Sequence, residues 1–285
     1  AAKAARAQFF LRPVSQVLTF ASFAVLVRLL PEREFGIYSL LLSSLAMFSS
    51  LLSLGLGNMV QRYVPEYAKA GEFTRAKRLA HAAMILRQMS ILTILAITAI
   101  FIPTIIRTYA LAGYEYLFIP LVFILMAQFQ SRMLTMVLQG LLYQKAALWG
   151  QVAFALVKMA AYATIWLAGG GLAAVMWAAL GANLVMLAIL TINYRHRVIP
   201  LSGGPSALGK EERKRVAKYA LFYNFNDVGV FGLGRDIDNF FLGAMVSPLA
   251  VGAYSFAGKL TDFMMRIAPV SFFYSVVQPM FFTLD

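Results

Sequence analysis

The sequence predicts an all-α polytopic membrane protein, and three observations support this fold class. Hydrophobic residues make up 61% of the chain and charged residues only 13%, whereas about 25% of residues are charged in an average soluble domain. About eight stretches are apolar over roughly the 20 residues that a helix needs to cross a bilayer. The alternation of apolar and polar residues typical of membrane β-barrel strands is absent. Helices are expected because they satisfy their own backbone groups in lipid.

The expected spans follow one another with short polar or Gly/Pro-containing breaks. They cover residues 9–30, 35–56, 82–106, 117–142, 146–167, 171–193, 219–246 and 250–282. Between the second and third spans, residues 61–79 have the pattern of a short amphipathic helix on the cytoplasmic surface, which ends near Gly71 and resumes into the third span. Residues 199–209 form a linker by composition. We therefore predict a six-helix lobe over 1–198, a cytoplasmic linker over 199–216, and the first two helices of a second lobe over 217–285.

Membrane topology explains the net charge of +13. Lysines and arginines gather before the first span and after the even-numbered spans, and almost only Arg28, Arg33 and Arg107 fall on the other side. By the positive-inside rule, the N-terminus and the basic loops are cytoplasmic. We expect a multi-pass protein of the cytoplasmic (inner) membrane whose basic loops contact lipid headgroups, with no nucleic-acid partner.

A short pattern recurs near the start of the second and the eighth spans. The residues FGIYS at 35–39 return as VGAYS at 251–255, and each copy follows a proline-containing loop. Because six spans separate the copies, both have the same orientation, as in transporters built from parallel repeats. If each repeat has six spans, the second one stops after two spans here. The chain is therefore expected to be C-terminally truncated.

Ionisable groups inside the spans are the candidate functional residues, because each costs at least about 2.5 kcal/mol near the bilayer centre. Arg132 and Lys158 fall near mid-depth of the fourth and fifth spans. In the seventh span, polar and aromatic residues recur at steps of three and four, which places them on one helical stripe. This stripe consists of Asn224, Asp227, Phe231, Arg235 and Asp238, widened by Asp236 and Asn239. For Gly229, Gly232 and Gly234 in the same span, close helix packing is favoured over local unwinding.

The eighth span places Lys259, Asp262 and Arg266 on one helical face. Together the charged groups predict a polar cavity. An anionic phosphate or diphosphate headgroup would be bound by the cations Arg132, Lys158, Arg235, Lys259 and Arg266. Charge balance, or the binding of a coupling proton or sodium ion, is assigned to the carboxylates Asp227, Asp236, Asp238 and Asp262. The polar walls of the cavity would include Asn224 and Asn239. An ion-paired stripe that only fixes helix packing is an alternative interpretation of the charges in the last two spans.

Neither a metal site, a cofactor nor a catalytic residue is expected. The chain has no cysteine, and both histidines, His81 and His196, fall in predicted loops. The sequence contains no HExxH, Walker, GxSxG or nucleotide-binding motif. No predicted loop is long enough for a soluble catalytic domain. An enzyme is therefore disfavoured.

Two runs of sequence carry a family resemblance. RLLPEREFGIYSLLLS, followed by LLSLGLGNMVQRYVPEYAKAGEFTRAKRL, is similar to the N-terminal part of the polysaccharide biosynthesis (O-antigen) flippases of the multidrug/oligosaccharidyl-lipid/polysaccharide exporter superfamily. RDIDNFFLGAMVSPLAVGAYSFAGKL resembles the start of the second lobe in that family. The resemblance implies two six-helix lobes around a cavity that opens alternately to the two sides. This chain departs from the pattern by stopping after the second helix of lobe two.

The resemblance and the predicted cavity imply a transporter, a flippase that moves a polyprenyl-diphosphate-linked oligosaccharide across the membrane for O-antigen, capsule or exopolysaccharide synthesis. Arg132, Lys158 and Arg235 would engage the diphosphate, and other polysaccharide-assembly proteins would be partners. Two alternatives stay open. One is a cation-coupled multidrug exporter of the same superfamily, in which the carboxylates would dominate. The other is a membrane-embedded glycan polymerase or ligase, which would be expected to have a large outer loop with acid and base groups.

Overall fold

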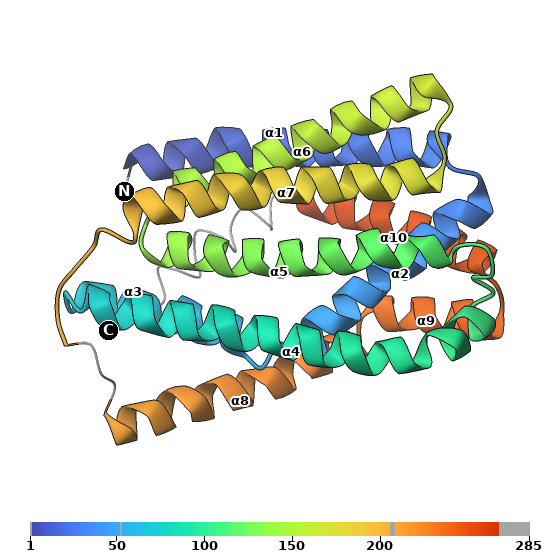
Figure 1. Cartoon of the computed structure of the whole chain (residues 1–285). Helices are drawn as coiled ribbons and strands as arrows, with labels where there is room; N and C mark the ends of the chain where they lie inside the picture. Colours follow the sequence, from blue (N-terminus) through green and yellow to red (C-terminus); the bar gives the residue numbers. More distant parts are fainter. Residues whose placement is uncertain (1, 52, 206–208, 268–285) are drawn as a thin grey trace.

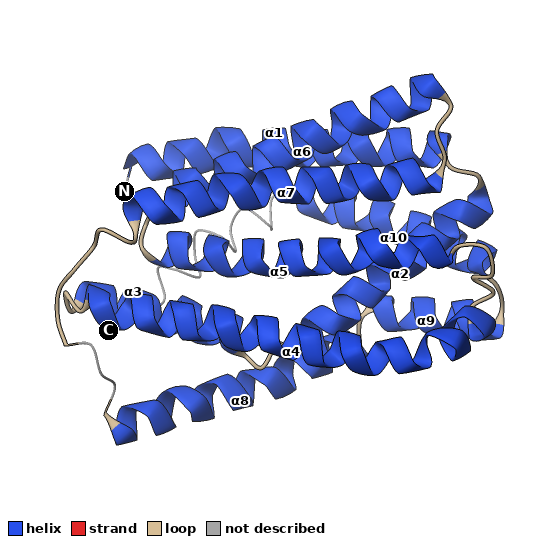
Figure 2. Ribbon diagram, in the orientation of Figure 1, coloured by secondary structure: helices blue, strands red, loops and turns tan. Residues whose placement is uncertain are grey.

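The structure is a computed structural model that describes residues 2–51, 53–205 and 209–267. Within these residues it contains helices and no strand (Figure 2). The helices are α1 (Ala2–Leu29), α2 (Glu32–Leu51), α3 (Leu56–Lys69), α4 (Phe73–Thr108), the short 3-10 helix η1 (Glu115–Leu117), α5 (Phe118–Gly140), α6 (Gln144–Ala168), α7 (Leu172–Arg197), α8 (Lys210–Gly232), α9 (Arg235–Met245) and α10 (Pro248–Ile267).

The predicted all-α polytopic membrane fold is confirmed. In the described part of the chain, four helical segments are long and apolar enough to cross a membrane: Phe73–Thr108, Glu115–Gly140, Gln144–Ala168 and Leu172–Arg197. A shorter apolar run, Pro13–Leu29, lies in α1. The second predicted span corresponds to α2, with only its last residue, Leu56, in α3, whereas the seventh is divided between α8 and α9. The eighth corresponds to α10, and its predicted continuation beyond residue 267 lies outside the described residues.

The α2–α3 and α8–α9 connections lie midway along the bundle, and the other connections lie at alternating ends (Figure 1). The N-terminus, the α3–α4 turn, the α5–α6 turn and the α7–α8 connection share one end, which we call the basic end because it carries the lysine- and arginine-rich loops. The α1–α2, α4–α5, α6–α7 and α9–α10 connections share the other, which we call the opposite end. This alternation is the arrangement that a chain crossing a bilayer repeatedly must have.

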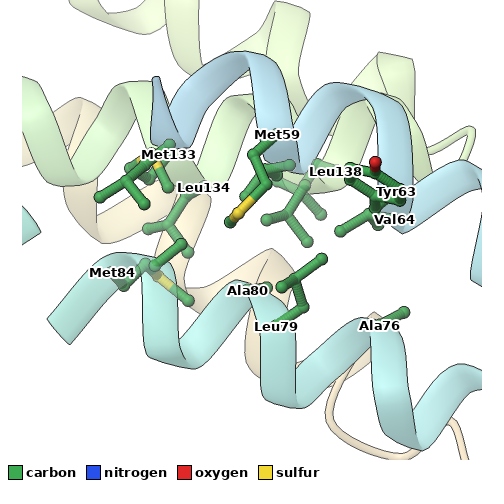
Figure 3. Close-up of a cluster of buried hydrophobic side chains, with 14 of the residues drawn as sticks. Met59, Tyr63, Val64, Ala76, Leu79, Ala80, Met84, Met133, Leu134 and Leu138 are labelled. Carbon is green, nitrogen blue, oxygen red and sulfur yellow. The ribbon is translucent and has the colours of Figure 1, made fainter. Parts of the chain in front are cut away.

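The helix predicted within residues 61–79 corresponds to α3, which ends at Lys69, and its predicted continuation after Gly71 corresponds to the start of α4 at Phe73. α3 already begins at Leu56 and packs along α4 and α5, and Figure 3 shows its side chains facing those of α4 and α5. Tyr63 and Val64 on its apolar face are 1% and 0% exposed. The amphipathic pattern correctly indicates a helix. Neighbouring helices rather than lipid cover its apolar face, however, because α4 extends well beyond the predicted third span and runs beside it.

The seventh predicted span is not one helix. α8 begins at Lys210, inside the predicted linker, and ends at Gly232, and α9 begins at Arg235. The expectation of close packing is wrong at Gly229 and Gly232, where an added side-chain carbon would meet no atom of the structure within 4 Å. Gly229 and Gly232 remain within α8, whereas Gly234 takes an extended conformation that starts α9, so local unwinding is confined to the end of this glycine-containing segment. The predicted single stripe of polar residues is consequently split between two helices.

Two buried apolar clusters hold the described helices together. One joins α1, α2, α4, α5, α6 and α7, and includes Tyr38, Phe129 and Tyr162. The other joins α3, α4 and α5 to α7 and the first half of α8, and part of it is drawn in Figure 3. The last two predicted spans pack against the rest of the bundle chiefly through α2 and α3. Helix α2 contacts α8, α9 and α10, and α3 contacts α8. The polar groups described below lie along these contacts.

The two copies of the repeated pattern lie directly against each other, where α2 crosses α10 at the opposite end. A side-chain carbon added at Gly36 would lie 1.8 Å from the carbonyl oxygen of Pro248, and one added at Gly252 would lie 3.1 Å from the carbonyl oxygen of Glu32. Each glycine thus faces the backbone four residues before the other. The contact is reciprocal, as expected for two parallel copies related by a two-fold axis.

Candidate functional site

A cavity of about 590 Å³ lies between α1, α2, α6, α9 and α10. This is within the range of about 300–1,000 Å³ that is usual for ligand sites. Its charged lining residues are Lys158, Asp236, Lys259 and Asp262, and Asn239 adds an amide. Hydroxyl groups and aromatic rings from α1, α2 and α6 complete the wall. The structure therefore brings together five of the residues predicted from the sequence, from three different helices.

Lys158 reaches the cavity from α6. Its ammonium group lies 5.7 Å from the centre of the Phe154 ring and 5.4 Å from that of Tyr162, close enough for cation–π attraction. The Tyr162 hydroxyl is in turn 3.2 Å from the hydroxyl of Tyr38 on α2. Tyr162 is completely buried, so this pair fixes one wall of the cavity. Aromatic faces thus attract the lysine while its polar end stays at the cavity surface.

A chain of hydrogen bonds joins α2 to α9 and α10 at the cavity wall. The hydroxyl of Ser43 donates to Asp236 (2.9 Å), and Asn239 donates to the same hydroxyl (2.7 Å). Ser255 then donates to the side-chain oxygen of Asn239 (3.1 Å). Asn239 is only 6% exposed, so these bonds satisfy a buried amide that would otherwise be costly to desolvate. Asp236 keeps an orientation toward the cavity as a result.

Two further pairs involve α9 and α10. Arg235, at the start of α9, forms an ion pair with Asp262 of α10, and its side chain also lies against Gly258. Asp238 accepts a hydrogen bond of 2.5 Å from the hydroxyl of Tyr254. Neither Arg235 nor Asp238 lines the cavity, although the partner of Arg235 does. Both pairs support the interpretation that part of the charged stripe fixes helix packing.

The remaining predicted residues lie elsewhere. Asn224 accepts a hydrogen bond of 3.0 Å from Ser53, and Asp227 accepts one of 3.3 Å from Asn58, so both contact the region where α2 gives way to α3. Arg132 is an exposed residue of α5 outside the cavity lining. The side chain of Arg266 lies outside the described part of the structure. The structure thus divides the predicted residues between the cavity and a second polar region beside α3, α5 and α8.

Comparison with known proteins gives the family. A family model described as polysaccharide biosynthesis protein matches residues 9–284, which is nearly the whole chain. The chain belongs to the polysaccharide biosynthesis protein family. No curated protein and no solved structure matches it. At the level of the family, it is a multi-pass membrane protein concerned with polysaccharide transport. The family predicted from the sequence is confirmed.

This polysaccharide biosynthesis protein also contains buried polar residues that the sequence prediction missed. Arg87 on α4 is only 6% exposed, and its guanidinium group lies 4.5 Å from the centre of the Phe129 ring. From the sequence, Arg87 is grouped with the basic residues near the cytoplasmic surface. Its position inside the predicted span 82–106 could have indicated a buried charge. For the serine Ser43, which joins Asp236 to Asn239, the sequence offers no signal, because serines are common in membrane helices and only the contact with α9 distinguishes this one.

In the family member described here, no three His, Cys, Asp or Glu side chains among the described residues lie close enough to hold a metal ion. The charged groups at the cavity are instead Lys158 and Lys259 with Asp236 and Asp262, and Arg235 lies against Asp262. The cavity lining itself therefore has two lysines and two carboxylates, and Arg235 lies outside it as the ion-pair partner of Asp262. Such a cavity can hold an anionic group without leaving it unpaired in a low-dielectric surrounding.

Proposed function

We propose that this protein is a flippase that moves a polyprenyl-diphosphate-linked oligosaccharide across the cytoplasmic membrane, for O-antigen, capsule or exopolysaccharide synthesis. The observation that carries the proposal is the cavity of about 590 Å³, to which Lys158 and Lys259 contribute from different helices, between the helices of a polysaccharide biosynthesis family member. The N-terminus and the basic end are cytoplasmic under this proposal, as the positive-inside rule requires. The substrate enters from that side, and alternating access carries it to the outer leaflet.

Lys158 and Lys259 are assigned to the diphosphate. Both are cavity residues on different helices, so they can approach a diphosphate from two sides, and an ammonium group is a strongly attracting point charge for phosphate oxygens. Arg235 contributes through its ion pair with Asp262. A diphosphate that draws Arg235 away would release the Asp262 carboxylate. That carboxylate can then take up a proton or sodium ion, which would couple transport to an ion gradient.

The proposed activity is transport and not covalent catalysis. The hydroxyl of Ser43 donates to the carboxylate of Asp236 and accepts a hydrogen bond from Asn239, and Ser255 donates to the amide oxygen of Asn239. These bonds belong to the helix contact between α2, α9 and α10. A glycan polymerase or ligase is therefore the least supported of the alternatives.

A cation-coupled multidrug exporter is the second candidate. The cavity contains the carboxylates Asp236 and Asp262 beside aromatic rings, among them Phe20 and Phe263, whose ring centres are 3.8 Å apart. Carboxylates and aromatic faces together suit an organic cation. The additional cations Lys158 and Lys259 repel such a ligand, so the flippase is preferred.

The proposal is tested by Lys158→Gln in the purified protein, reconstituted in proteoliposomes with a fluorescent polyprenyl-diphosphate oligosaccharide. Translocation is measured by the loss of outer-leaflet fluorescence to an impermeant reductant. We expect a decrease of about a hundredfold, since a contact between charged groups is worth up to about 3 kcal/mol. Lys145→Gln, on the exposed start of the same helix, is the matched control and should have no effect. Equal rates for both variants would refute the cavity assignment, and dye efflux driven by a cation gradient without lipid translocation would establish the exporter.

A further inference from the structure

A second group of charged side chains lies away from the cavity, on the side of α5 that faces α4. Its centre is Arg87, which is 6% exposed. Arg87 is fourteen residues past the first residue of α4, about 21 Å along the helix at 1.5 Å per residue. The guanidinium group therefore lies deep inside the bundle, where a charge is costly and usually marks function.

Arg132 lies next to Arg87. The ring that the Arg87 guanidinium group covers belongs to Phe129, and Arg132 follows Phe129 by three residues on α5, so the two share a helical face about 5–6 Å apart at their Cβ atoms. The two arginines are near enough to repel each other electrostatically. Two neighbouring cations raise the local positive potential and so favour an anion at this position.

Asp227 on α8 is the carboxylate that acts on Arg87 from across the helix contact. Its Oδ1 atom accepts a hydrogen bond of 3.3 Å from Asn58 on α3. Beside the arginines, the amide of Gln88 donates to Gln130 (3.2 Å), which joins α4 to α5. Asp227 therefore acts on the buried Arg87, and the surrounding amide contacts hold α3, α4 and α5 in place.

The two arginines differ in exposure in a way that suits a binding site. Arg87 is buried and its orientation is fixed by the Phe129 ring, whereas the side chain of Arg132 is exposed. A buried, oriented cation beside an accessible one can bind an anion from two directions. Guanidinium groups are suited to phosphate because their N–H groups match its oxygens in pairs. Neither arginine lines the cavity described above.

We propose that Arg87 and Arg132 form a second anion site, which binds the phosphate group of a lipid in the half of the bundle nearer the basic end. Arg132 lies eight residues before the last residue of α5, about 12 Å from that end of the helix. A lipid phosphate at the membrane surface would therefore need to move only a short way inward to reach it. Two lipids supply this chemistry: a polyprenyl diphosphate and an anionic phospholipid. The site does not depend on the function proposed for the cavity.

The test is native mass spectrometry of the purified protein, titrated separately with a polyprenyl diphosphate and with phosphatidylglycerol. For the lipid that occupies the site, Arg132→Gln should weaken one binding event by about tenfold or more, the value of one lost charged contact. Arg107→Gln removes an exposed arginine at the other end of α4 and should leave both titrations unchanged. The lipid whose binding is lost identifies the source of the phosphate.

Further variants separate binding from folding and from the cavity. Arg87→Lys keeps the buried charge but loses the paired N–H groups, so we expect weaker binding of the same lipid with a thermal melting temperature close to wild type. Lys158→Gln should leave this binding event intact while it lowers translocation. Equal binding of both lipids to Arg132→Gln and Arg107→Gln would overturn the proposal, whatever the result for Lys158→Gln.

Discussion

The contacts between the last described helices and the preceding ones differ at the two ends of the bundle. At the opposite end, α10 meets α2 backbone to backbone at Gly36 and Gly252, and Asn239 makes buried hydrogen bonds. At the basic end, the start of α8 is held by ion pairs, of Arg215 with Glu66 and of Arg75 with Glu212 (Figure 1). Arg215 and Glu66 are 56% and 42% exposed.

This difference indicates which end can separate more easily. Exposed ion pairs contribute about 0–1 kcal/mol each because water and salt screen them. Buried hydrogen bonds leave unsatisfied groups when they break, and a backbone contact without side chains has no flexible part that can adapt. Only the first turns of α8 can therefore move at low cost. Farther along α8, Val216 and Ala220 are buried, and a side-chain carbon added at Gly55 would lie 1.8 Å from the carbonyl oxygen of Ala220.

The largest effect is expected for Gly36→Leu. Even the first side-chain carbon would lie 1.8 Å from the carbonyl oxygen of Pro248, so α2 and α10 must separate. We expect a loss of several kcal/mol, comparable to the most severe substitutions in protein cores, seen as a large drop in the thermal melting temperature in detergent. Gly229→Ala in α8 is the control, because its added carbon meets no atom within 4 Å, and it should be neutral or stabilising by up to about 1 kcal/mol. A wild-type melting temperature for Gly36→Leu would contradict the backbone contact.

A smaller effect is expected for Asn239→Leu. This change leaves Ser43 and Ser255 without their amide partner in a buried position, at a cost of about 2–3 kcal/mol. Asn224 is half-buried and accepts a hydrogen bond from Ser53. Asn224→Leu removes this single bond and should cost about 1 kcal/mol. The two variants are compared by their melting temperatures under the same conditions. A greater loss for Asn224→Leu would reverse the ranking of the two regions.

The smallest effect is expected for Arg215→Gln at the basic end. Because the pair with Glu66 is largely exposed, its loss should change stability by no more than about 1 kcal/mol. The difference between the variant and the wild type should disappear at about 1 M salt, where the screening length falls to roughly 3 Å. Melting temperatures at low and high salt measure this. A destabilisation as large as that of Asn239→Leu would show that the two ends are held equally.

The sequence predicts the spans and most of the cavity for one physical reason. Charged groups in apolar helices must face each other or water, so Lys158, Asp236, Lys259 and Asp262 could be assigned together before their positions were known. The arrangement within the seventh span could not be predicted in the same way. Glycines allow both close packing and unwinding, and only the structure shows that Gly229 has no close neighbour and that the unwinding is at Gly234, where α9 starts.

Arg87 illustrates a second limit of prediction from sequence. Hydropathy places the start of the third span at residue 82, so an arginine five residues later resembles a surface charge that marks topology. The helix in fact begins at Phe73, because the preceding polar residues pack against α3 and α8 rather than facing only water. The depth of a charge thus depends on where neighbouring helices end, which a single segment of sequence does not contain.

The reciprocal contact of the two glycines also has the symmetry of a subunit interface. In a two-fold symmetric dimer, if residue i of one subunit contacts residue j of the other, then residue j of the first subunit also contacts residue i of the second. Gly36 faces the carbonyl group four residues before Gly252, and Gly252 faces the one four residues before Gly36. A pair of separate, identical subunits would make this same contact across its interface. The contact between α2 and α10 therefore has the symmetry of a homodimer interface, although both helices belong to one polypeptide.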